Sequence, residues 1–217
     1  MPPVTRSIVW KGSPNFGYPR GTHGQLGRHT WGKVYHISGG GTLNGMGSWF
    51  NNPAASASAH FGIDGRIIHQ YVKLSNAAWH AGGVASPDLS NSIIRKLTRD
   101  NLNPNRYLVG IEVVASPGDV LSKSTWDSLI WLSDYIDQEL GLGDQPDVHL
   151  GHNQINSVSR ARDPVSVYDP RKVWREHHMA ELTQAQKEAI IKGMLLGGLV
   201  DIEAITTRFD LRDTLLF

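Results

Sequence analysis

The segment 106–115 constrains the fold of this chain more than any other. It reads Arg-Tyr-Leu-Val-Gly-Ile-Glu-Val-Val-Ala, an almost unbroken run of apolar residues. A run of this kind is typical of a strand that is buried on both faces of its sheet. We therefore predict a sheet that other elements cover on both sides. Glu112 is the single carboxylate inside the run, and burying a carboxylate requires a specific partner or a chemical role.

The other predicted elements are strands bounded by turn residues and helices marked by capping residues. The hairpin 59–72 is predicted to turn at Asp64-Gly65, a pair that favours positive φ. One helix is predicted to begin at the capping box Ser124–Asp127 and to end at Gly141, and another to occupy 169–174. Further short strands are predicted at 8–10, 33–37 and 147–150. This content predicts one mixed α/β domain.

The two ends of the chain differ from this domain in character. Residues 1–31 are rich in Gly, Pro and basic side chains, which predicts an ordered but irregular arm. After residue 178 the sequence favours helices, interrupted at Gly197-Gly198. We place a boundary near residue 180, so that a domain 1–180 precedes a small C-terminal helical segment 181–217.

Charge and composition exclude several classes of function. Lys and Arg number 21 against 20 Asp and Glu, so no net field points toward nucleic acid. The longest apolar stretch, Met194–Val200, is far shorter than the roughly 20 residues that span a bilayer. The first residues lack the apolar segment of about 7–15 residues found in secretory signals, so synthesis in a cytoplasm is expected. There is no cysteine, so any metal must be held by His, Asp or Glu.

A candidate metal site follows from the positions of two histidines and one aspartate. His36 and His152 each lie at the C-terminal end of a predicted strand, where α/β proteins commonly place ligand-binding groups. Asp163 follows His152 by eleven residues and can return to the same place. Catalytic Zn²⁺ uses three protein ligands and keeps a fourth position for water. Spacing alone leaves open the alternative that these are hydrogen-bonded structural groups.

Short segments around these residues carry a resemblance to a known family. In chain order they are Val34-Tyr-His-Ile-Ser38, Trp49-Phe-Asn-Asn-Pro-Ala-Ala55, Ser58-Ala-His-Phe-Gly-Ile-Asp64, Ala78-Trp-His-Ala-Gly82, Val109-Gly-Ile-Glu112, Leu150-Gly-His152 and Arg162-Asp-Pro164. Together they resemble the zinc-dependent N-acetylmuramoyl-L-alanine amidases. This type-2 amidase family is related to the peptidoglycan recognition proteins and occurs in many phage endolysins. The resemblance covers about residues 33–175.

The resemblance implies a fold, a reaction and a set of roles. It implies a mixed central β-sheet flanked by helices, with zinc in an open groove. The expected reaction is hydrolysis of the amide between N-acetylmuramic acid and L-alanine in bacterial peptidoglycan. His36, His152 and Asp163 match the zinc ligands, and the family uses either Cys or Asp as the third. Glu112 matches a carboxylate that acts beside the metal, although a local Arg or backbone donors would also explain a buried carboxylate there.

Two departures from the family pattern affect the expected catalytic groups. Many members have a lysine two residues before the third ligand, but this chain has Ala161 there, between two arginines. We assign the oxyanion-stabilising role to Arg162 and keep Arg160 as the alternative. A catalytic tyrosine found in some members is replaced by Ala59.

The groove residues are expected to include histidines and tryptophans of the matching segments. His60 either supports the metal site or belongs to the core. Trp79 and His80 are expected near the substrate, with core packing as the alternative for Trp79. Trp49 is expected to contact sugar or peptide, although a polar loop and helix start also explain its segment.

The most economical biological interpretation is a phage endolysin. Such an enzyme is made in the host cytoplasm and acts on the cell wall after release by another protein. One alternative is a cytoplasmic amidase that trims anhydro-muropeptides during wall recycling, and another is a non-catalytic peptidoglycan-binding module. Residues 181–217 are expected to bind the wall, to dimerise, or to pack on themselves or on the catalytic domain, and the oligomeric state stays open.

Overall fold

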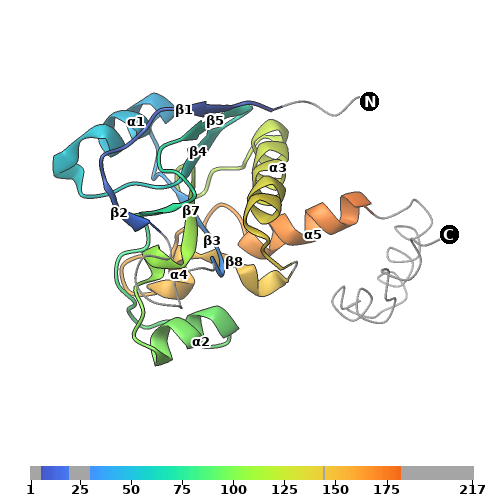
Figure 1. The fold of residues 1–217 in the computed structure, drawn as a ribbon. Coiled ribbons are helices and arrows are strands. Elements are labelled where there is room, and N and C mark those ends of the chain that lie inside the picture. The colour runs from blue at the N-terminus through green and yellow to red at the C-terminus, as the bar shows by residue number, and fades with distance from the viewer. Residues whose placement is uncertain (1–5, 20–29, 144, 182–217) are drawn as a thin grey trace, which may run out of the picture. The chain divides into compact units, whose positions relative to one another are not determined.

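The computed structural model describes residues 6–19, 30–143 and 145–181 of the 217-residue chain (Figure 1). The chain divides into two compact units, Met1–Glu176 and His177–Phe217. Within the described ranges, no helix has the length and apolar character needed to span a bilayer. The predicted helical segment 181–217 lies beyond the described residues from 182 onward, so its role stays a prediction.

The described part contains both strands and helices. The strands are β1 (Ile8–Trp10), β2 (Phe16–Pro19), β3 (Gly32–Ile37), β4 (Phe61–Asp64), β5 (Ile67–Gln70), β6 (Asn76–Ala78), β7 (Leu108–Val113) and β8 (His149–Gly151). The α-helices are α1 (Leu43–Asn51), α2 (Ser92–Arg99), α3 (Lys123–Leu140), α4 (His152–Ile155) and α5 (Pro170–Glu181). Short 3-10 turns are η2 (Pro53–Ala55), η3 (Pro104–Arg106) and η4 (Pro146–Val148).

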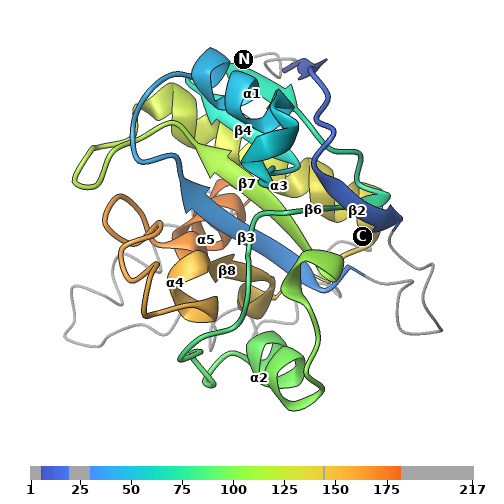
Figure 2. The same cartoon turned by 90° about the vertical axis from the view of Figure 1, so that its left-hand side faces the viewer.

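The central sheet has the strand order β1-β5-β4-β7-β3-β8. Its interior strand β7 comes from the apolar run 106–115 and pairs in parallel with β3 and β4 (Figure 2). The β4–β5 hairpin is antiparallel, whereas β1 joins β5 and β8 joins β3 in parallel. Strands β2 and β6 form a separate antiparallel pair. The mixed sheet that the resemblance implies is therefore confirmed.

One face of the sheet packs against α3 and the first part of α5. Helix α3 contributes Leu129, Leu132 and Ile136, all fully buried, because its apolar residues recur at helical spacing. They meet a layer of fully buried strand residues: Tyr35, Phe61, Ile63, Ile68, Val109, Ile111 and Val113. Each fully buried aliphatic side chain contributes about 1.5–3 kcal/mol of hydrophobic stabilisation, so this layer is a main support of the sheet.

The opposite face is covered by two smaller groups. Helix α1 buries Leu43, Met46 and Phe50 against residues around β4 and β6. Helix α2 buries Ile94 and Leu97 in a cluster that includes residues of β3, β7 and β8. Helices therefore cover both faces of the sheet, as the apolar character of β7 requires.

Several boundaries differ from the sequence-based prediction, each for a local reason. Helix α3 begins at Lys123, ahead of the predicted capping box, because the Ser122 hydroxyl accepts the N–H of Thr125 at 3.2 Å. The hairpin turns one residue later than predicted, since Asp64 still pairs with Ile67 and Gly65 takes the positive φ of 56°.

Several elements were not predicted at all, among them β6 and α4. Helix α1 contains two glycines that weaken its helical pattern, and α2 is only one short amphipathic segment. Strand β2 lies within the predicted irregular arm, so residues 16–19 are extended where irregular structure was expected.

A buried ion pair connects the sheet to α3. Lys33 lies on β3 with a fully buried side chain, and its Nζ is 2.5 Å from both carboxylate oxygens of Asp137 on α3. The ammonium of Lys33 lies out of water and is neutralised by a carboxylate that remains partly exposed. The pair therefore fixes the position of α3 on the strand that ends at His36.

Candidate metal centre and groove

An open groove of about 390 Å³ lies at the carboxyl ends of β3 and β7. His36 on β3 and Glu112 on β7 are register partners, so their side chains leave the same face of the sheet. The groove is lined by His36, Ile37, Ser38, Gly40, Gly41, Thr42, Gly45, Met46, Trp49, Phe50, Ala57, Ser58, Trp79, His80, Glu112, His152, Arg160 and Asp163. It thus brings together all three predicted metal ligands and Glu112.

His36, His152 and Asp163 form a tight cluster. Asp163 Oδ2 is 3.3 Å from His36 Nδ1 and 3.1 Å from His152 Nδ1. The other carboxylate oxygen, Oδ1, accepts the backbone N–H of Ile37 at 2.8 Å, which fixes the orientation of the carboxylate. The three potential ligand atoms all lie within 4.8 Å of one another.

The hydrogen bonds of His152 show what kind of group the cluster can accept. Its Nε2 is 3.1 Å from the carbonyl oxygen of Ala81, which can only accept, so we assign the proton of the neutral ring to Nε2. Nδ1 then has a lone pair that faces the carboxylate of Asp163. Burial lowers the pKa of His36 below its usual value, although Asp163 opposes the shift, so a neutral ring is favoured there as well.

This arrangement fits a zinc ion. Bonds of about 2.0–2.1 Å place the ligands of a tetrahedral zinc about 3.4 Å apart. Asp163 Oδ2 lies at similar separations, 3.3 and 3.1 Å, from the two histidine nitrogens. Burial opposes ionisation of Asp163, but its contacts with His152 and His36, together with the N–H that Ile37 donates, outweigh burial and hold the pKa of the carboxyl below its ordinary value. Two neutral imidazoles and one carboxylate are a donor set that zinc accepts. The residues present therefore fit the metal that the resemblance implies.

Glu112 lies in the groove with an uncompensated carboxyl group. Its Oε2 is buried and has no hydrogen-bond partner within the described part of the chain. Burial raises the pKa of Glu112 to about 8, the charge of Asp163 adds to the rise, and Arg160 opposes it. A group with such a pKa can exchange a proton near neutral pH. The structural alternative, a carboxylate satisfied by an Arg or backbone donors, lacks a hydrogen bond for this oxygen.

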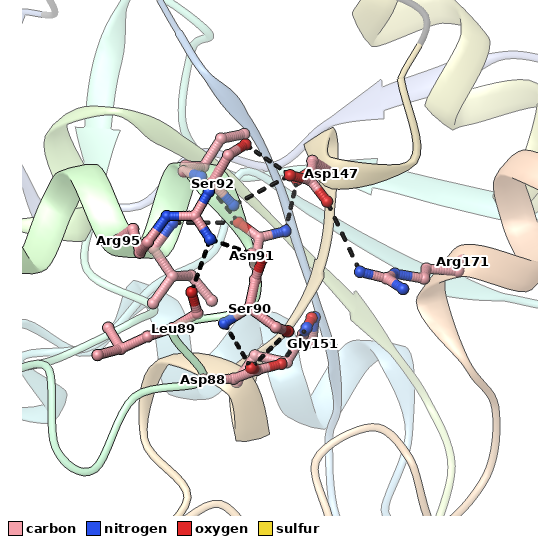
Figure 3. Close-up of polar contacts among 12 residues, drawn as sticks. Asp88, Leu89, Ser90, Asn91, Ser92, Arg95, Asp147, Gly151 and Arg171 are labelled. Carbon is pink, nitrogen blue, oxygen red and sulfur yellow. Dashed lines mark hydrogen bonds and ion pairs between the residues drawn. The ribbon is translucent and has the colours of Figure 1, made fainter.

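A polar network holds the helix that begins with His152. Gln154 accepts the N–H of Gly151 and donates to Asp88 Oδ2, both at 3.0 Å. Asp88 Oδ1 accepts the backbone N–H and the hydroxyl of Ser90, so the loop before α2 is tied to α4 (Figure 3). The network continues through Asp147, whose Oδ2 accepts the N–H and hydroxyl of Ser92. His152 is therefore placed by contacts from a distant loop as well as by its own strand.

The other predicted groove residues divide into two groups. Trp49 and Trp79 line the groove with 56% and 38% of their surface exposed, so neither is a core residue. His80 also lines the groove. His60 does not: it is fully buried, its Nδ1 accepts the N–H of Gly110, and its Nε2 contacts the carbonyl of Asn76. His60 therefore does not line the groove, and its ring lies behind that of His80 at 5.8 Å between ring centres.

The arginines are arranged differently from the sequence assignment. Arg160 lines the groove, and its positive charge acts on two groups there. For His36 it adds to the larger effect of burial, which lowers the pKa. For Glu112 it opposes the larger effect of burial, which raises the pKa. Arg162 is not among the lining residues. Of the two arginines considered for the oxyanion, Arg160 is therefore the one that faces the groove.

Sequence reasoning passed over Asn105, a residue that supports the site without lining it. Its Oδ1 accepts the backbone N–H groups of His80 and Ala81 at 3.1 and 2.8 Å. It lies in η3, just ahead of the central strand, and is 9% exposed. In the sequence, the signal that could have identified it is a polar residue directly before the predicted buried strand 106–115.

Several solved structures share this fold, and three of them are described here. A mutant endolysin from Bacillus subtilis is 20% identical, with a TM-score of 0.55 over 80% of this chain and 99% of its own. The catalytic domain of XlyA is 20% identical, with a TM-score of 0.53 over 77% of this chain and 98% of its own. A selenomethionine derivative of AmpD is 18% identical, with a TM-score of 0.55 over 78% of this chain and 93% of its own.

Comparison at the level of sequence gives one positive result. No curated protein matches the chain. The family model described as N-acetylmuramoyl-L-alanine amidase matches residues 27–166, a range that includes His36, Glu112, His152 and Asp163. The chain therefore belongs to the N-acetylmuramoyl-L-alanine amidase family.

Proposed function

We propose that this chain is a zinc-dependent hydrolase of the amide bond between N-acetylmuramic acid and L-alanine in peptidoglycan. The convergence of His36 Nδ1, His152 Nδ1 and Asp163 Oδ2 in an open groove carries the proposal. Membership of the amidase family supports the choice of substrate. The coarser conclusion, a peptidoglycan amidase, does not depend on which metal is bound.

His36, His152 and Asp163 are the residues that would hold the zinc. Bound there, the metal supplies a Lewis acid that polarises the substrate carbonyl and lowers the pKa of a water toward about 7. Asp163 is prepared for this role because Ile37 N–H holds one of its oxygens at 2.8 Å and leaves the other facing the histidines.

Glu112 is proposed to carry the proton during hydrolysis. It takes the proton from the attacking water as the oxygen bonds to the carbonyl carbon, and it gives the proton to the L-alanine nitrogen as the C–N bond breaks. Its pKa of about 8 suits both halves of this transfer near neutral pH. The buried Oε2 of Glu112 has no hydrogen-bond partner among the described residues, so it is available for this proton transfer.

Arg160 and the two exposed tryptophans are proposed to act on the substrate. Arg160 provides a positive charge for the tetrahedral oxyanion, in the place of the lysine that many family members have. Trp49 and Trp79 offer flat apolar surfaces on which sugar rings or peptide can pack.

The proposed biological role is that of an endolysin that degrades the wall of a bacterial host. The alternative is a recycling amidase that acts on soluble muropeptides. Purified intact walls and small anhydro-muropeptide fragments separate these roles when turnover of both is measured side by side. Rapid loss of wall turbidity supports the endolysin, whereas cleavage of fragments alone supports recycling.

The reaction itself is tested by product identity. Purified peptidoglycan is digested with the native protein, with a chelator-treated sample, and with that sample after Zn²⁺ is restored. We expect stem peptides with a free L-alanine amino terminus, lost on chelation and regained with zinc. Tight binding to walls without new amino termini would instead support a binding module and refute the hydrolase.

A further inference from the structure

The segment Trp79–Ala81 is held rigidly beside the metal cluster. The Ser58 hydroxyl accepts the N–H of Trp79 at 3.0 Å. The side chain of Asn105 accepts the next two N–H groups, those of His80 and Ala81, at 3.1 and 2.8 Å. Three consecutive backbone donors therefore have fixed partners, and the position of the His80 ring follows from them.

The two histidines of the cluster obtain their outer hydrogen bonds from this segment in different ways. His152 Nε2 reaches the carbonyl of Ala81 directly at 3.1 Å. His36 Nε2 reaches no carbonyl, because it faces His80 Nδ1 at 3.1 Å. The other nitrogen of His80, Nε2, is 3.2 Å from the carbonyl of Leu108. A backbone carbonyl is thus connected to each histidine, but for His36 the connection passes through a second imidazole.

The chain of contacts determines where the protons lie. The Leu108 carbonyl can only accept, so His80 carries its proton on Nε2 and presents a lone pair at Nδ1. His36 must then donate from Nε2 to that lone pair, which leaves His36 Nδ1 without a proton. This is the nitrogen that faces Asp163 in the cluster. Both ring nitrogens of His80 are used, so none is left to bind substrate.

Strand β7 leaves room for this imidazole by having a glycine opposite it. A Cβ at Gly110 would lie 2.4 Å from His80 Cγ and 2.7 Å from its Cδ2. Contacts this short do not occur, so any side chain at this position would displace the ring. The Gly110 found in the central apolar strand is therefore explained by the space that His80 occupies.

We propose that His80 is a positioning residue that sets the tautomer and orientation of His36 by relaying the Leu108 carbonyl to it. This replaces the expectation that His80 contacts the substrate. The inference rests on the proposed function in that the cluster is taken to bind zinc. A metal-binding histidine usually donates its other N–H to a carbonyl, carboxylate or water, and loss of that partner costs about 10–100-fold in metal affinity.

The first test uses the wild-type chain without metal. Long-range ¹H–¹⁵N NMR spectra distinguish the two neutral tautomers of each histidine, and the spectra of His80→Gln and His36→Gln assign the signals. We expect the proton on Nε2 in both His36 and His80. A proton on Nδ1 of His80 would overturn the relay without any need for a stable variant.

The second test measures zinc affinity by competition with a chromophoric chelator. His80→Ala is expected to bind zinc about 10–100-fold more weakly. His80→Gln keeps a donor and an acceptor, so it is expected to recover part of that loss. His69→Ala removes an imidazole that lies outside the groove lining and is the matched control, with unchanged zinc affinity.

The outcomes separate this proposal from the proposed function. Unchanged zinc affinity in His80→Ala, together with a raised KM, would return His80 to the role of a substrate contact and refute the relay. A wild-type chain that binds no zinc would refute the proposed metal site, while the tautomers of the metal-free protein would still decide whether the relay exists.

Discussion

Replacing one member of the Lys33–Asp137 ion pair is expected to destabilise the first compact unit, by an amount that depends on which charge remains. The side chain of Lys33 is 0% exposed and that of Asp137 is 26% exposed. Breaking a buried pair costs about 3–5 kcal/mol when the remaining charge stays out of water. Asp137→Asn leaves the buried ammonium behind and is expected to reach this range.

Variants that remove Lys33 are expected to lose less unfolding free energy than Asp137→Asn. Lys33→Met keeps most of the apolar stem and leaves a carboxylate that reaches water, so a loss of about 1–3 kcal/mol is expected. The double variant Lys33→Met/Asp137→Leu removes both charges and is expected to fall within about 1 kcal/mol of wild type. The order of stability, with the double variant above both single variants, is the distinctive expectation.

Urea unfolding followed by tryptophan fluorescence measures these differences. The seven tryptophans, of which the last is Trp174, all lie in the first unit, so the signal reports on that unit. With a urea slope of about 2–3 kcal/mol/M, a loss of 4 kcal/mol lowers the midpoint by roughly 1.5–2 M. An Asp137→Asn midpoint equal to that of wild type would show that Lys33 is not in a poorly solvated position and would refute the reasoning.

Three further predictions concern the groove. Glu112→Gln is expected to lower kcat by about 10²–10⁴-fold with zinc content unchanged, measured by peptide release and metal analysis, and normal turnover would exclude Glu112 as the proton carrier. Arg160→Ala is expected to lower kcat by about 10²–10³-fold while Arg162→Ala stays near wild type, and the reverse order would restore the first assignment. Asp163→Cys is expected to retain zinc but to unfold with about 1–3 kcal/mol less stability in urea, and equal stability would show that the Asp163–Ile37 hydrogen bond is unimportant.

Much of the fold, and the clustering of the three candidate ligands, could be predicted because they depend on local patterns. The run 106–115 identified the interior strand β7, and turn residues after 33–37 and 147–150 located the ends of β3 and β8. Since parallel strands end at the same edge of a sheet, His36 and His152 were expected to meet there. Helices α1 and α2 were missed because glycines in one and the brevity of the other weaken their periodicity.

The roles that could not be predicted depend on contacts between distant parts of the chain. Which arginine faces the groove is decided by the path of the loop after α4, and alternation of residue types along that loop does not specify it. The position of His80 depends on Asn105 and Leu108, which lie 25 and 28 residues away in sequence. The spacing of these residues in the sequence does not predict their contacts, because the contacts form only when the chain has folded.

The presence of aspartate at the position of the proposed third ligand also agrees with the geometry. Asp163 has two oxygens with separate tasks, since Oδ1 accepts the N–H of Ile37 at the end of β3 and Oδ2 faces both histidines. A thiolate has a single ligand atom, so a cysteine at this position would hold metal at the expense of that N–H. Strand β3 therefore positions His36 through its backbone and Asp163 through the N–H of the next residue. Two of the three proposed ligands are thus fixed by adjacent residues of one strand.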